Sequence, residues 1–460
     1  MLIGLDFGTT NCAAARFDGE RVHIFGLEPG SENPALMRAM LYVSRDQPAV
    51  CGQQAIEAHQ TQSVERSGMR TRRYVGHVEM TFAETGAVKG YPGGAASVAQ
   101  PVYALVDDEA PGRLLTSLKS ELAAREAAVM VSGQRHPLER LIARILEEIR
   151  IRIEAASGQR VRGAVIGRPV RFSAAEGPED DARGEWRLRQ AAELAGFDHV
   201  EIDLEPVAAA CAYAQGGIQA HNVFVFDFGG GTLDLTVMHL SSHGKHQVLS
   251  SGSIDLAGDA LDRCITAGVI LDHLGRGSTW GPDRSPFPEH HFDVVLHWQF
   301  PPQAGPSETL RFLRLARQTS SHPARLQAFE ALLALNRVAQ LGQEVEATKI
   351  ALSSSPFAVM RLAGEEFDLW QPLTRSQFEA LIGDVLHQVD RCVRETLAQS
   401  GLQPEEIAAV LCTGGSSQIP CVSALLERVF GPEKIRRLDP FTSVAAGLAI
   451  RAWQIENARG

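Results

Sequence analysis

The sequence lacks several features that would assign it to a specialised class of protein. Its seven cysteines are scattered, without a Cys-x-x-Cys pair, which disfavours a disulfide framework or a zinc site and fits a reducing compartment. No apolar run is long enough to span a membrane, and the N-terminus has no signal-peptide pattern. A net charge of −11 disfavours non-specific binding to nucleic acid. We therefore expect a cytoplasmic protein, long enough at 460 residues for two or more hydrophobic cores.

The most informative stretch runs from Val223 to Met238 and reads VFVFDFGGGTLDLTVM. Its two runs on either side of three glycines predict a β-hairpin. Consecutive glycines leave no side chain in the way, so backbone N–H groups can close around an anion. Thr232 adds a hydroxyl, and Asp227 and Asp234 suit a divalent cation that lies between them and a phosphate. The stretch therefore predicts a magnesium-phosphate site; a plain tight turn between two strands is the alternative.

The chain begins with a similar pattern, LIGLDFGTTNCAAARF, from Leu2 to Phe17. Asp6 in this stretch matches Asp227, and Gly8 matches Gly229. The distance between the two copies is far larger than the period of a repeat protein. Two matched hairpins therefore suggest two similar halves, each of which offers a hairpin to one shared phosphate chain.

A third glycine turn lies near the C-terminus. A predicted strand, Ile407–Cys412, is followed by Gly414, Gly415 and a helix that starts at Pro420. The glycines let the backbone approach a ligand, and the N-terminus of a helix favours a negative charge. Apolar periodicity predicts further elements between these motifs. The expected helices are Leu138–Ser157, Trp186–Ala195, Pro323–Leu352, Arg375–Ser400 and Ser443–Glu456, and the expected strands are Arg162–Ile166, Val200–Leu204, Phe357–Leu362 and Glu366–Trp370.

Three segments are expected to lie outside these regular elements. Gly177–Gly184 reads as a loop, and Gly275–Pro306 reads as an irregular insertion. The adjacent histidines of Glu289–Asp293 suggest metal binding, but neighbouring side chains in a strand point to opposite faces, which disfavours it. A basic cluster is favoured to be a solvated face over a contact site for phosphates or an acidic partner. It comprises Arg66, Arg70, Arg72 and Arg73.

Seven motifs, in order along the chain, resemble the ATPase domain of the 70-kDa heat-shock (DnaK-like) proteins. IGLDFGTTN and VFDFGGGTLDL resemble the family's two phosphate motifs, and AVIGRP and LEPVAAACAY resemble its proline-bearing strand and its interlobe helix. LAGDALD resembles the glycine turn after the second hairpin, and EATKIALSSS and LCTGGSSQIP resemble the helix and the turn that bind adenosine. The likeness runs from residue 1 to about 455 and is nearest to the shortened YegD-like branch, whose members consist of this domain alone.

The resemblance implies an α/β protein with the actin-like ATPase fold (ribonuclease H-like, duplicated), in which two lobes enclose a nucleotide cleft. Lobe I would comprise residues 1–217, with 436–460 returning to it and a variable subdomain at about 28–137. Lobe II would comprise residues 218–435, with a variable subdomain at about 258–374. A β-sandwich domain that binds peptides is not expected.

The resemblance also implies which residues form the site. Asp6, Glu205 and Asp227 would surround Mg²⁺, mostly through water. Lys119 would match the family's catalytic lysine, which steadies the γ-phosphate and the attacking water, and Glu205, Asp227 and Thr232 would complete the catalytic group. The nucleotide itself would contact Gly8, Thr9, Thr10, Gly229, Gly230, Gly231, Thr232, Gly258, Glu346, Lys349, Ser353, Gly414, Gly415 and Ser416.

Some positions depart from the family pattern. The family holds adenine between two arginines, whereas the matching positions here are Ile350 and Gln418. Weaker or less adenine-selective binding is therefore expected, because the guanidinium contacts are lost. Pro169 would be the family's proline switch, but its arginine partner is replaced in a segment that contains Glu185 and Arg187.

These features favour a chaperone-like protein that binds ATP with Mg²⁺ and hydrolyses it slowly to ADP and phosphate. The expected partners are ATP and a protein partner or client that contacts the nucleotide domain, without nucleic acid or membrane. The first alternative is a nucleotide-binding interaction module that no longer hydrolyses ATP. The second is a small-molecule kinase of the same superfamily.

Overall fold

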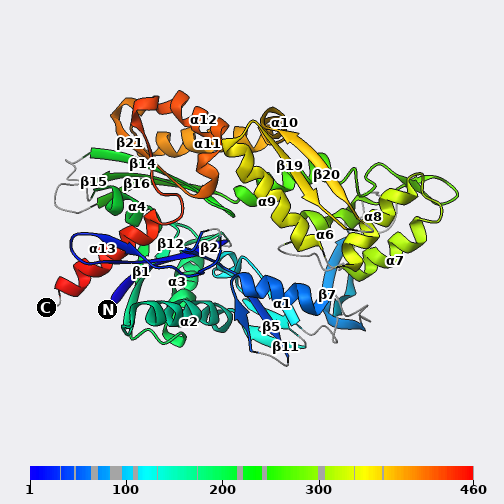
Figure 1. Ribbon diagram of the computed structural model, residues 1–460, viewed down its shortest axis with the longest axis horizontal. Helices are drawn as coiled ribbons and strands as arrows, with labels where there is room; N and C mark the ends of the chain where they lie inside the picture. The colour runs from blue at the N-terminus through cyan, green and yellow to red at the C-terminus, as the bar shows by residue number, and fades with distance from the viewer. Residues whose placement is uncertain are drawn as a thin grey trace, which may run out of the picture.

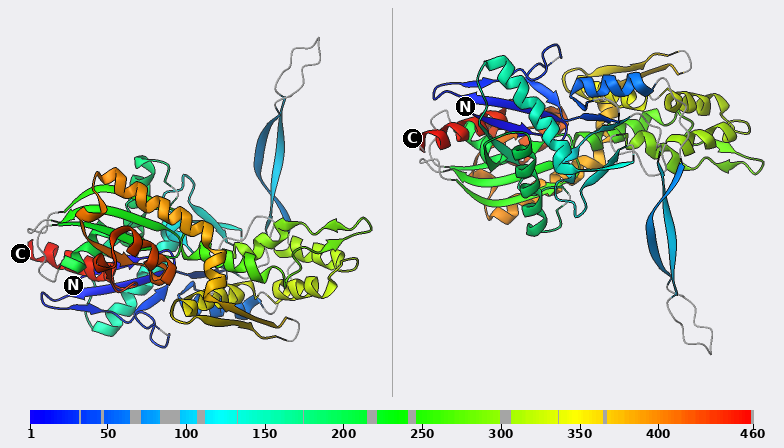
Figure 2. Two further views of the ribbon diagram at one scale, coloured as in Figure 1. Left: turned by 90° about the horizontal axis from the view of Figure 1, so that it is seen from above. Right: turned by 90° about the horizontal axis from the view of Figure 1, so that it is seen from below.

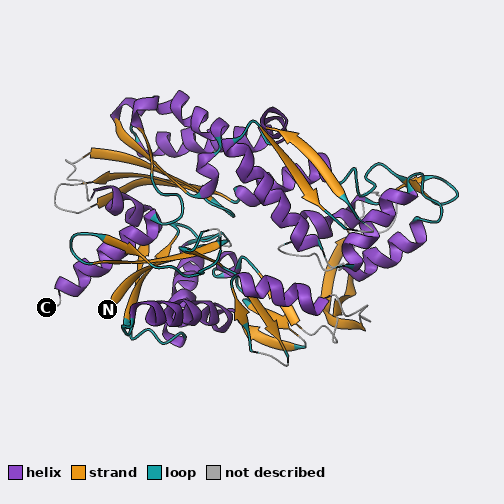
Figure 3. Ribbon diagram, in the orientation of Figure 1, coloured by secondary structure: helices purple, strands orange, loops and turns teal. Residues whose placement is uncertain are grey.

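The computed structural model describes residues 1–31, 33–45, 48–63, 71–82, 96–106, 112–131, 133–173, 175–214, 221–240, 246–298, 306–335, 337–364 and 367–458. These residues form a mixed α/β protein built around two large sheets (Figure 3). The sheets stack with helices between them and on their outer faces, and both chain ends lie on the same side of the molecule (Figure 1).

The two sheets have the same topology. The first has the strand order β13–β12–β1–β2–β3, in which β1 (Leu2–Phe7) and β2 (Asn11–Phe17) form an antiparallel hairpin. The second has the order β22–β21–β14–β15–β16, in which β14 (His221–Phe228) and β15 (Leu233–Leu240) form the hairpin. In each sheet, two parallel strands extend the hairpin on one side and an antiparallel strand extends it on the other. The two predicted hairpins and the two similar halves are therefore confirmed.

The remaining strands of the first sheet are β3 (Val22–Ile24), β4 (Leu36–Arg38), which pairs with β2, β12 (Gly163–Arg168) and β13 (His199–Leu204). Those of the second are β16 (His246–Ile254), β21 (Ile407–Thr413) and β22 (Ile435–Arg437). The described residues of 1–204 are here called the first half, and those of 221–437 the second half.

Two helices, α4 (Glu205–Ala214) and α13 (Ser443–Ala458), lie between the sheets (Figure 1). They share one apolar cluster with both sheets, which includes Val165 of β12 and Val225 of β14. The alanine-rich sequence of α4 lets the helices cross closely. A Cβ atom at Gly447 of α13 would lie 1.8 Å from the carbonyl oxygen of Ala208, so only glycine fits at this crossing.

The outer faces carry α2 (Leu138–Ser157) and α3 (Pro178–Leu194) on the first sheet, and α11 (Gly383–Ser400) and α12 (Pro420–Phe430) on the second (Figure 1). The apolar stripe predicted for α2 is confirmed, because seven of its leucine and isoleucine side chains are buried in the core of the first half. None of the described helices is long and apolar enough to cross a membrane.

Smaller elements extend each half. In the first half they are α1 (Gln53–Ser63), the sheet β6–β5–β9 (Val50–Cys51, Leu41–Ser44, Gly112–Leu115), the short helix η1 (Leu118–Glu121) and the hairpin β10–β11 (Ala128–Val131, Gln134–Pro137). A two-stranded ribbon, β7 (Thr71–Phe82) with β8 (Ala96–Val106), projects away from the molecule (Figure 2). In the second half they are α5 (Gly258–Ile265), α7 (Pro306–Ala316), α8 (Pro323–Ala334), α9 (Val338–Ser354), α10 (Arg375–Leu381) and the hairpin β19–β20 (Phe357–Leu362, Leu369–Thr374).

The loop predicted at Gly177–Gly184 is wrong, because α3 begins at Pro178. Proline suits the first helical turn, where its missing N–H has no partner to lose. Three acidic residues follow in the first turn, and negative charge there stabilises the helix dipole. The polar composition that suggested a loop is therefore the signature of a helix start.

The insertion predicted to be irregular, Gly275–Pro306, is more regular than expected. Within 275–298 it forms the hairpin β17–β18 (Thr279–Trp280, Ser285–Pro286) and the short helices η3 (Glu289–Phe292) and α6 (Asp293–Leu296). The histidines thus lie in a helical turn and not in a strand. The ring of His291 stacks on Phe312, with 4.4 Å between the ring centroids. Among the described residues, no group of three His, Cys, Asp or Glu side chains could hold a metal ion.

Two long predicted helices are divided. Pro323–Leu352 is split into α8 and α9, and Arg375–Ser400 is split into α10 and α11 with a break at Ile382. Some predicted positions, namely Arg66, Arg70, residues 299–305 and Glu366, lie outside the described residues. Arg72 and Arg73 lie in β7.

Candidate functional site

The turns of the two hairpins face each other in direct contact. Each turn closes with a backbone hydrogen bond from its first glycine, Gly8 or Gly229, to the residue three positions on, at 3.0 and 3.2 Å. A Cβ atom at Gly230 would lie 2.2 Å from Oγ1 of Thr10. The second turn can therefore approach the first only because it has no side chains there. The structure thus brings together the predicted phosphate residues, including Thr9, whose methyl group lies 3.2 Å from a Cβ built on Gly231.

Two further glycine segments surround the second hairpin turn. The N–H of Gly258, at the start of α5, donates to the carbonyl of Gly229 at 3.1 Å, and the hydroxyl of Ser416 donates to the same carbonyl at 2.8 Å. Gly414 has a φ of 77°, and a Cβ atom there would lie 2.4 Å from the carbonyl oxygen of Phe228. The late glycine turn thus packs directly on the second hairpin, as a shared site requires, and Gly415 follows it.

Carboxylates from both halves gather around one buried lysine. The Nζ atom of Lys119, which is 7% exposed, lies 2.5 Å from Oε1 of Glu205. Burial alone lowers the pKa of Lys119, but the charges of Glu205 and Asp6 raise it above its ordinary value. Burial, together with the charge of Glu205, raises the pKa of Asp6 to about 7 and that of Asp227 well above its usual value. The three carboxylates therefore carry more negative charge than the single ammonium of Lys119 offsets, as expected of a site that binds a cation.

Among the described residues, no three His, Cys, Asp or Glu side chains are placed to bind a metal ion directly. A Mg²⁺ ion at this cluster would therefore be held through its own waters, several of which Mg²⁺ usually keeps. Thr232 lies beside this group: its hydroxyl donates to Asp234 at 2.7 Å, and Ser253 donates to the other oxygen of Asp234 at 2.8 Å. Burial raises the pKa of Asp234 to about 6.

A second cluster of charges contains Lys349 and Glu346, two of the residues predicted to contact the nucleotide. Lys349 of α9 donates to Asp262 at 2.8 Å and to the carbonyl of Gly258 at 3.2 Å. Glu346, one turn earlier on α9, accepts two hydrogen bonds from Arg38 of β4, at 3.0 and 3.2 Å. This pair joins the first half to the second across the cleft. Asp262 Oδ1 is buried without a partner in the described chain.

The two halves also meet through an apolar contact. Trp298 of the second half packs against a small cluster of the first half, and a Cβ atom at Gly342 of α9 would lie 2.4 Å from its indole. The cluster consists of Met40, Tyr42, Ala55 and Ile56. Trp298 also lines a small pocket whose walls include both members of the Arg38–Glu346 pair.

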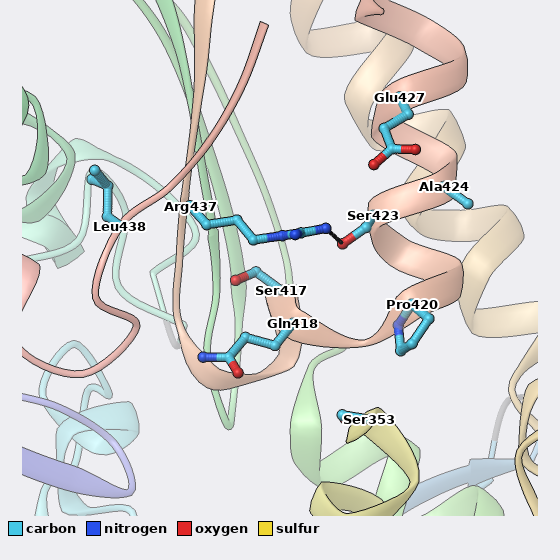
Figure 4. A pocket seen from close by; sticks show the side chains of 9 residues that line it. All are labelled: Ser353, Ser417, Gln418, Pro420, Ser423, Ala424, Glu427, Arg437 and Leu438. Atoms are coloured by element: carbon cyan, nitrogen blue, oxygen red, sulfur yellow. Dashed lines mark hydrogen bonds between the residues drawn. The ribbon is translucent and has the colours of Figure 1, made fainter. Parts of the chain in front are cut away.

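A polar pocket lies beyond Lys349 (Figure 4). Ser353 and Gln418, both predicted from the sequence, line it, and Arg437 crosses it to donate to Ser423 at 3.2 Å. Ile350 is 58% exposed and is not among the lining residues. The pocket has a guanidinium, but from β22 and not from either of the family's arginine positions.

The segment around Pro169 is held against α3 by an ion pair. Arg168 forms an ion pair with Glu185 of α3, with 3.1 Å between Nε and Oε2, and its guanidinium also donates to the carbonyl of Pro169. Arg187 turns away from this segment and donates to the carbonyl of Leu122.

Several site residues were not predicted. Asp262 and its neighbour Asp259 stand within the LAGDALD motif, so their spacing after Gly258 was a usable signal. Arg38 and Trp298 carry no local signal, because each acts through a partner that is remote in the sequence.

The comparisons with known proteins agree with this geometry. The family model described as "Hsp70 protein" matches residues 114–275 and 325–457, which is more than half of the chain. Chaperone protein DnaK of Halobacterium salinarum is 28% identical over 348 residues, or 74% of this chain and 46% of its own. Chaperone protein dnaK1 of a Nostoc species is 27% identical over 451 residues, or 98% of this chain and 54% of its own.

A third relative, the HscA homolog of an Azoarcus species, is 30% identical over 323 residues, or 70% of this chain and 42% of its own. The chain thus spans about half the length of the curated relatives that it matches. The family match implies the actin-like ATPase fold, which confirms the predicted fold class, whereas the YegD-like branch stays a prediction. The duplicated hairpins, the facing glycine turns and the family match lead to one conclusion: the chain belongs to the Hsp70 family.

Proposed function

We propose that this chain binds ATP with Mg²⁺ between the two hairpins and hydrolyses it slowly, as the nucleotide switch of a chaperone-like protein. The observation that carries the proposal is the buried Lys119–Glu205 pair, which lies among the carboxylates of Asp6 and Asp227 beside the facing glycine turns. The family relation supports nucleotide binding. The relatives are chaperones by name, which supports a chaperone-like role.

Phosphoryl transfer to water depends on charge neutralisation and positioning more than on covalent help. Bound Mg²⁺ would neutralise phosphate charge, held through water by Asp6, Glu205 and Asp227. Lys119 would donate to the γ-phosphate and fix the attacking water, because its ammonium is the positive group of this cluster. The glycine turns would donate backbone N–H groups to the phosphates, and Thr232 would add its hydroxyl.

We also propose the lobe division for this function: residues 1–217 with 436–460, and residues 218–435. The helices α4 and α13 pack between the two sheets and join them, so closure on ATP would change how the two sheets face each other. A protein client or co-chaperone that contacts these lobes would respond to that change. The cytoplasmic location stays a prediction.

The decisive experiment is single-turnover hydrolysis of ATP with Mg²⁺, with the bound nucleotide quantified in the same sample. Conversion of bound ATP to ADP supports the switch. Bound ATP that stays intact supports instead a non-hydrolysing interaction module, which the exposed Ile350 and Gln418 in place of two arginines favour. Absence of ATP binding contradicts both.

Gln418→Arg is expected to tighten ATP binding about two- to fivefold, because a guanidinium near the base restores a cation–π contact. Equilibrium titration with a fluorescent ATP analogue, competed by ATP, measures the change. Gln388→Arg, which adds the same charge on the exposed face of α11, is the matched control. Equal affinity in both variants contradicts the role assigned to position 418.

Arg38→Met is expected to speed ADP release about two- to fivefold, because it removes a two-pronged ion pair across the cleft that is partly shielded from water. Stopped-flow displacement of labelled ADP gives the rate. Arg314→Met is the control, since Arg314 pairs with Glu330 within the second half at 2.9 Å. If both variants release ADP at the same rate, the Arg38–Glu346 pair does not hold the cleft closed.

A further inference from the structure

Two arginines of α3 grip the segment that carries Lys119. Arg187 donates through Nη1 to the carbonyls of Leu122 and Ala124, at 2.7 and 2.5 Å. Arg183 donates through Nη2 and Nε to the carbonyl between them, that of Ala123, at 2.7 and 3.2 Å. Nη2 of Arg187 also donates to the carbonyl of Arg125 at 3.4 Å, so four consecutive carbonyls are contacted by one helix from about 60 residues away in the sequence. These contacts are here called the arginine clamp.

Burying the charged side chain of Arg187 costs free energy, which argues against an incidental contact. Arg187 is only 8% exposed, and no carboxylate of the described chain lies within ion-pair distance of it. Burial, together with the charge of Arg183, lowers the pKa of Arg187 from its usual value. A long charged side chain on an outer helix would normally extend its head into water. Here the desolvation of a full charge is compensated mainly by peptide carbonyls.

The gripped carbonyls are directly continuous with the turn that holds Lys119. Lys119 lies in η1 (Leu118–Glu121), and its own carbonyl accepts the N–H of Leu122 at 3.2 Å. On the other side of the turn, Ser117 has a φ of 53°, an uncommon left-handed conformation for a residue with a side chain. The turn that holds Lys119 is therefore flanked by an unfavourable backbone conformation on one side and by the clamp, which comes from a remote element, on the other.

The helix that provides the clamp is itself firmly seated. The backbone N–H of Phe172 donates to Asp181 of α3 at 2.8 Å, and a Cβ atom at Gly184 would lie 2.7 Å from the ring of Phe172. Glu185 forms the ion pair with Arg168 on the same stretch of chain. The clamp therefore connects the Pro169 segment, through α3, to the lysine of the proposed site.

We propose that Arg187 and Arg183 are positioning residues for Lys119: they hold its turn so that the ammonium stays beside Glu205 and in reach of the γ-phosphate. The inference rests on the proposed function, because it concerns the lysine that would act in hydrolysis. Neither arginine touches the nucleotide in this proposal. Their loss should affect the hydrolysis rate and leave ATP affinity nearly unchanged.

Arg187→Met is expected to lower the single-turnover hydrolysis rate roughly ten- to a hundredfold, as small displacements of a catalytic group do, with ATP affinity within about twofold of the unmodified protein. Arg187→Lys, which keeps the charge but has a single donor head, should recover part of the rate. Arg150→Met is the matched control, because Arg150 donates to the carbonyl of Ala195 at the other end of α3, at 2.9 Å.

A rate for Arg187→Met equal to that of Arg150→Met, or an equal loss of affinity and rate, overturns the proposal. Should Arg187→Met fail to fold, Arg183→Met tests the same clamp with a half-buried arginine.

Amide hydrogen exchange tests the clamp without any hydrolysis. Peptides that cover residues 116–124 should exchange at least about tenfold faster in Arg187→Met, with the rest of the first half unchanged. Unchanged exchange there, or faster exchange throughout, overturns the clamp. If the unmodified protein binds ATP but does not hydrolyse it, the proposed function fails, and this measurement still decides whether α3 orders the lysine segment.

Discussion

Lys119→Ala is expected to slow single-turnover ATP hydrolysis roughly a hundredfold or more, while ATP affinity changes by less than about threefold. The ammonium of Lys119 is buried between Glu205 and the acidic residues of the hairpins. It is the positive group placed to stabilise charge on the transferring phosphoryl group. Most of the binding energy for ATP would come from the glycine turns and the ribose side of the cleft, which the substitution leaves intact.

Rapid-quench measurement of ADP formation, with enzyme in excess over ATP, gives the rate for Lys119→Ala. Lys434→Ala is the control, since Lys434 donates to the carbonyls of Pro404 and Glu405, just before β21, at 2.7 and 3.2 Å. Hydrolysis at the unmodified rate in Lys119→Ala would remove this lysine from the mechanism.

Gly447→Ala is expected to destabilise the protein by about 3 kcal/mol or more, because its Cβ atom would lie 1.8 Å from the carbonyl oxygen of Ala208. In an ordinary exposed helix the same change stabilises by about 0.5–1 kcal/mol. The sign is reversed here because α13 crosses α4 without space for a methyl group. Either the helices separate, or the backbone shifts and disturbs both sheets.

The free energy of unfolding in urea, followed by circular dichroism, measures the effect of Gly447→Ala. Gly383→Ala is the matched control, since nothing lies within 4 Å of a Cβ atom at this helical glycine. It should unfold at the same or a slightly higher urea concentration. Equal stability of the two variants would mean that the crossing can relax.

Local pattern was enough to predict the hairpins and their glycine turns. A strand that alternates on both sides of Gly229 needs no knowledge of distant residues, and the same holds for the pattern around Gly8. That the two turns face one site was predicted from the similarity of their sequences. Helix α2 was predicted from apolar spacing alone, because a single buried face determines it.

Long-range contacts explain what was missed. Arg38 meets Glu346 across 308 positions of the sequence, and no local pattern distinguishes it from a surface arginine. Arg187 was considered only as a replaced partner of Pro169, whereas its hydrogen bonds go to the Lys119 segment. The start of α3 was missed for a different reason, since proline and acidic residues serve both loops and helix starts.

The fluorescence of Trp298 should report on the contact between the two halves. Its indole is packed on apolar side chains of the first half and on α9 of the second. Any separation of the two halves at this end must bring water to the ring, and indole emission shifts to longer wavelength in water. Trp298 is therefore an intrinsic fluorophore placed at the contact between the two halves.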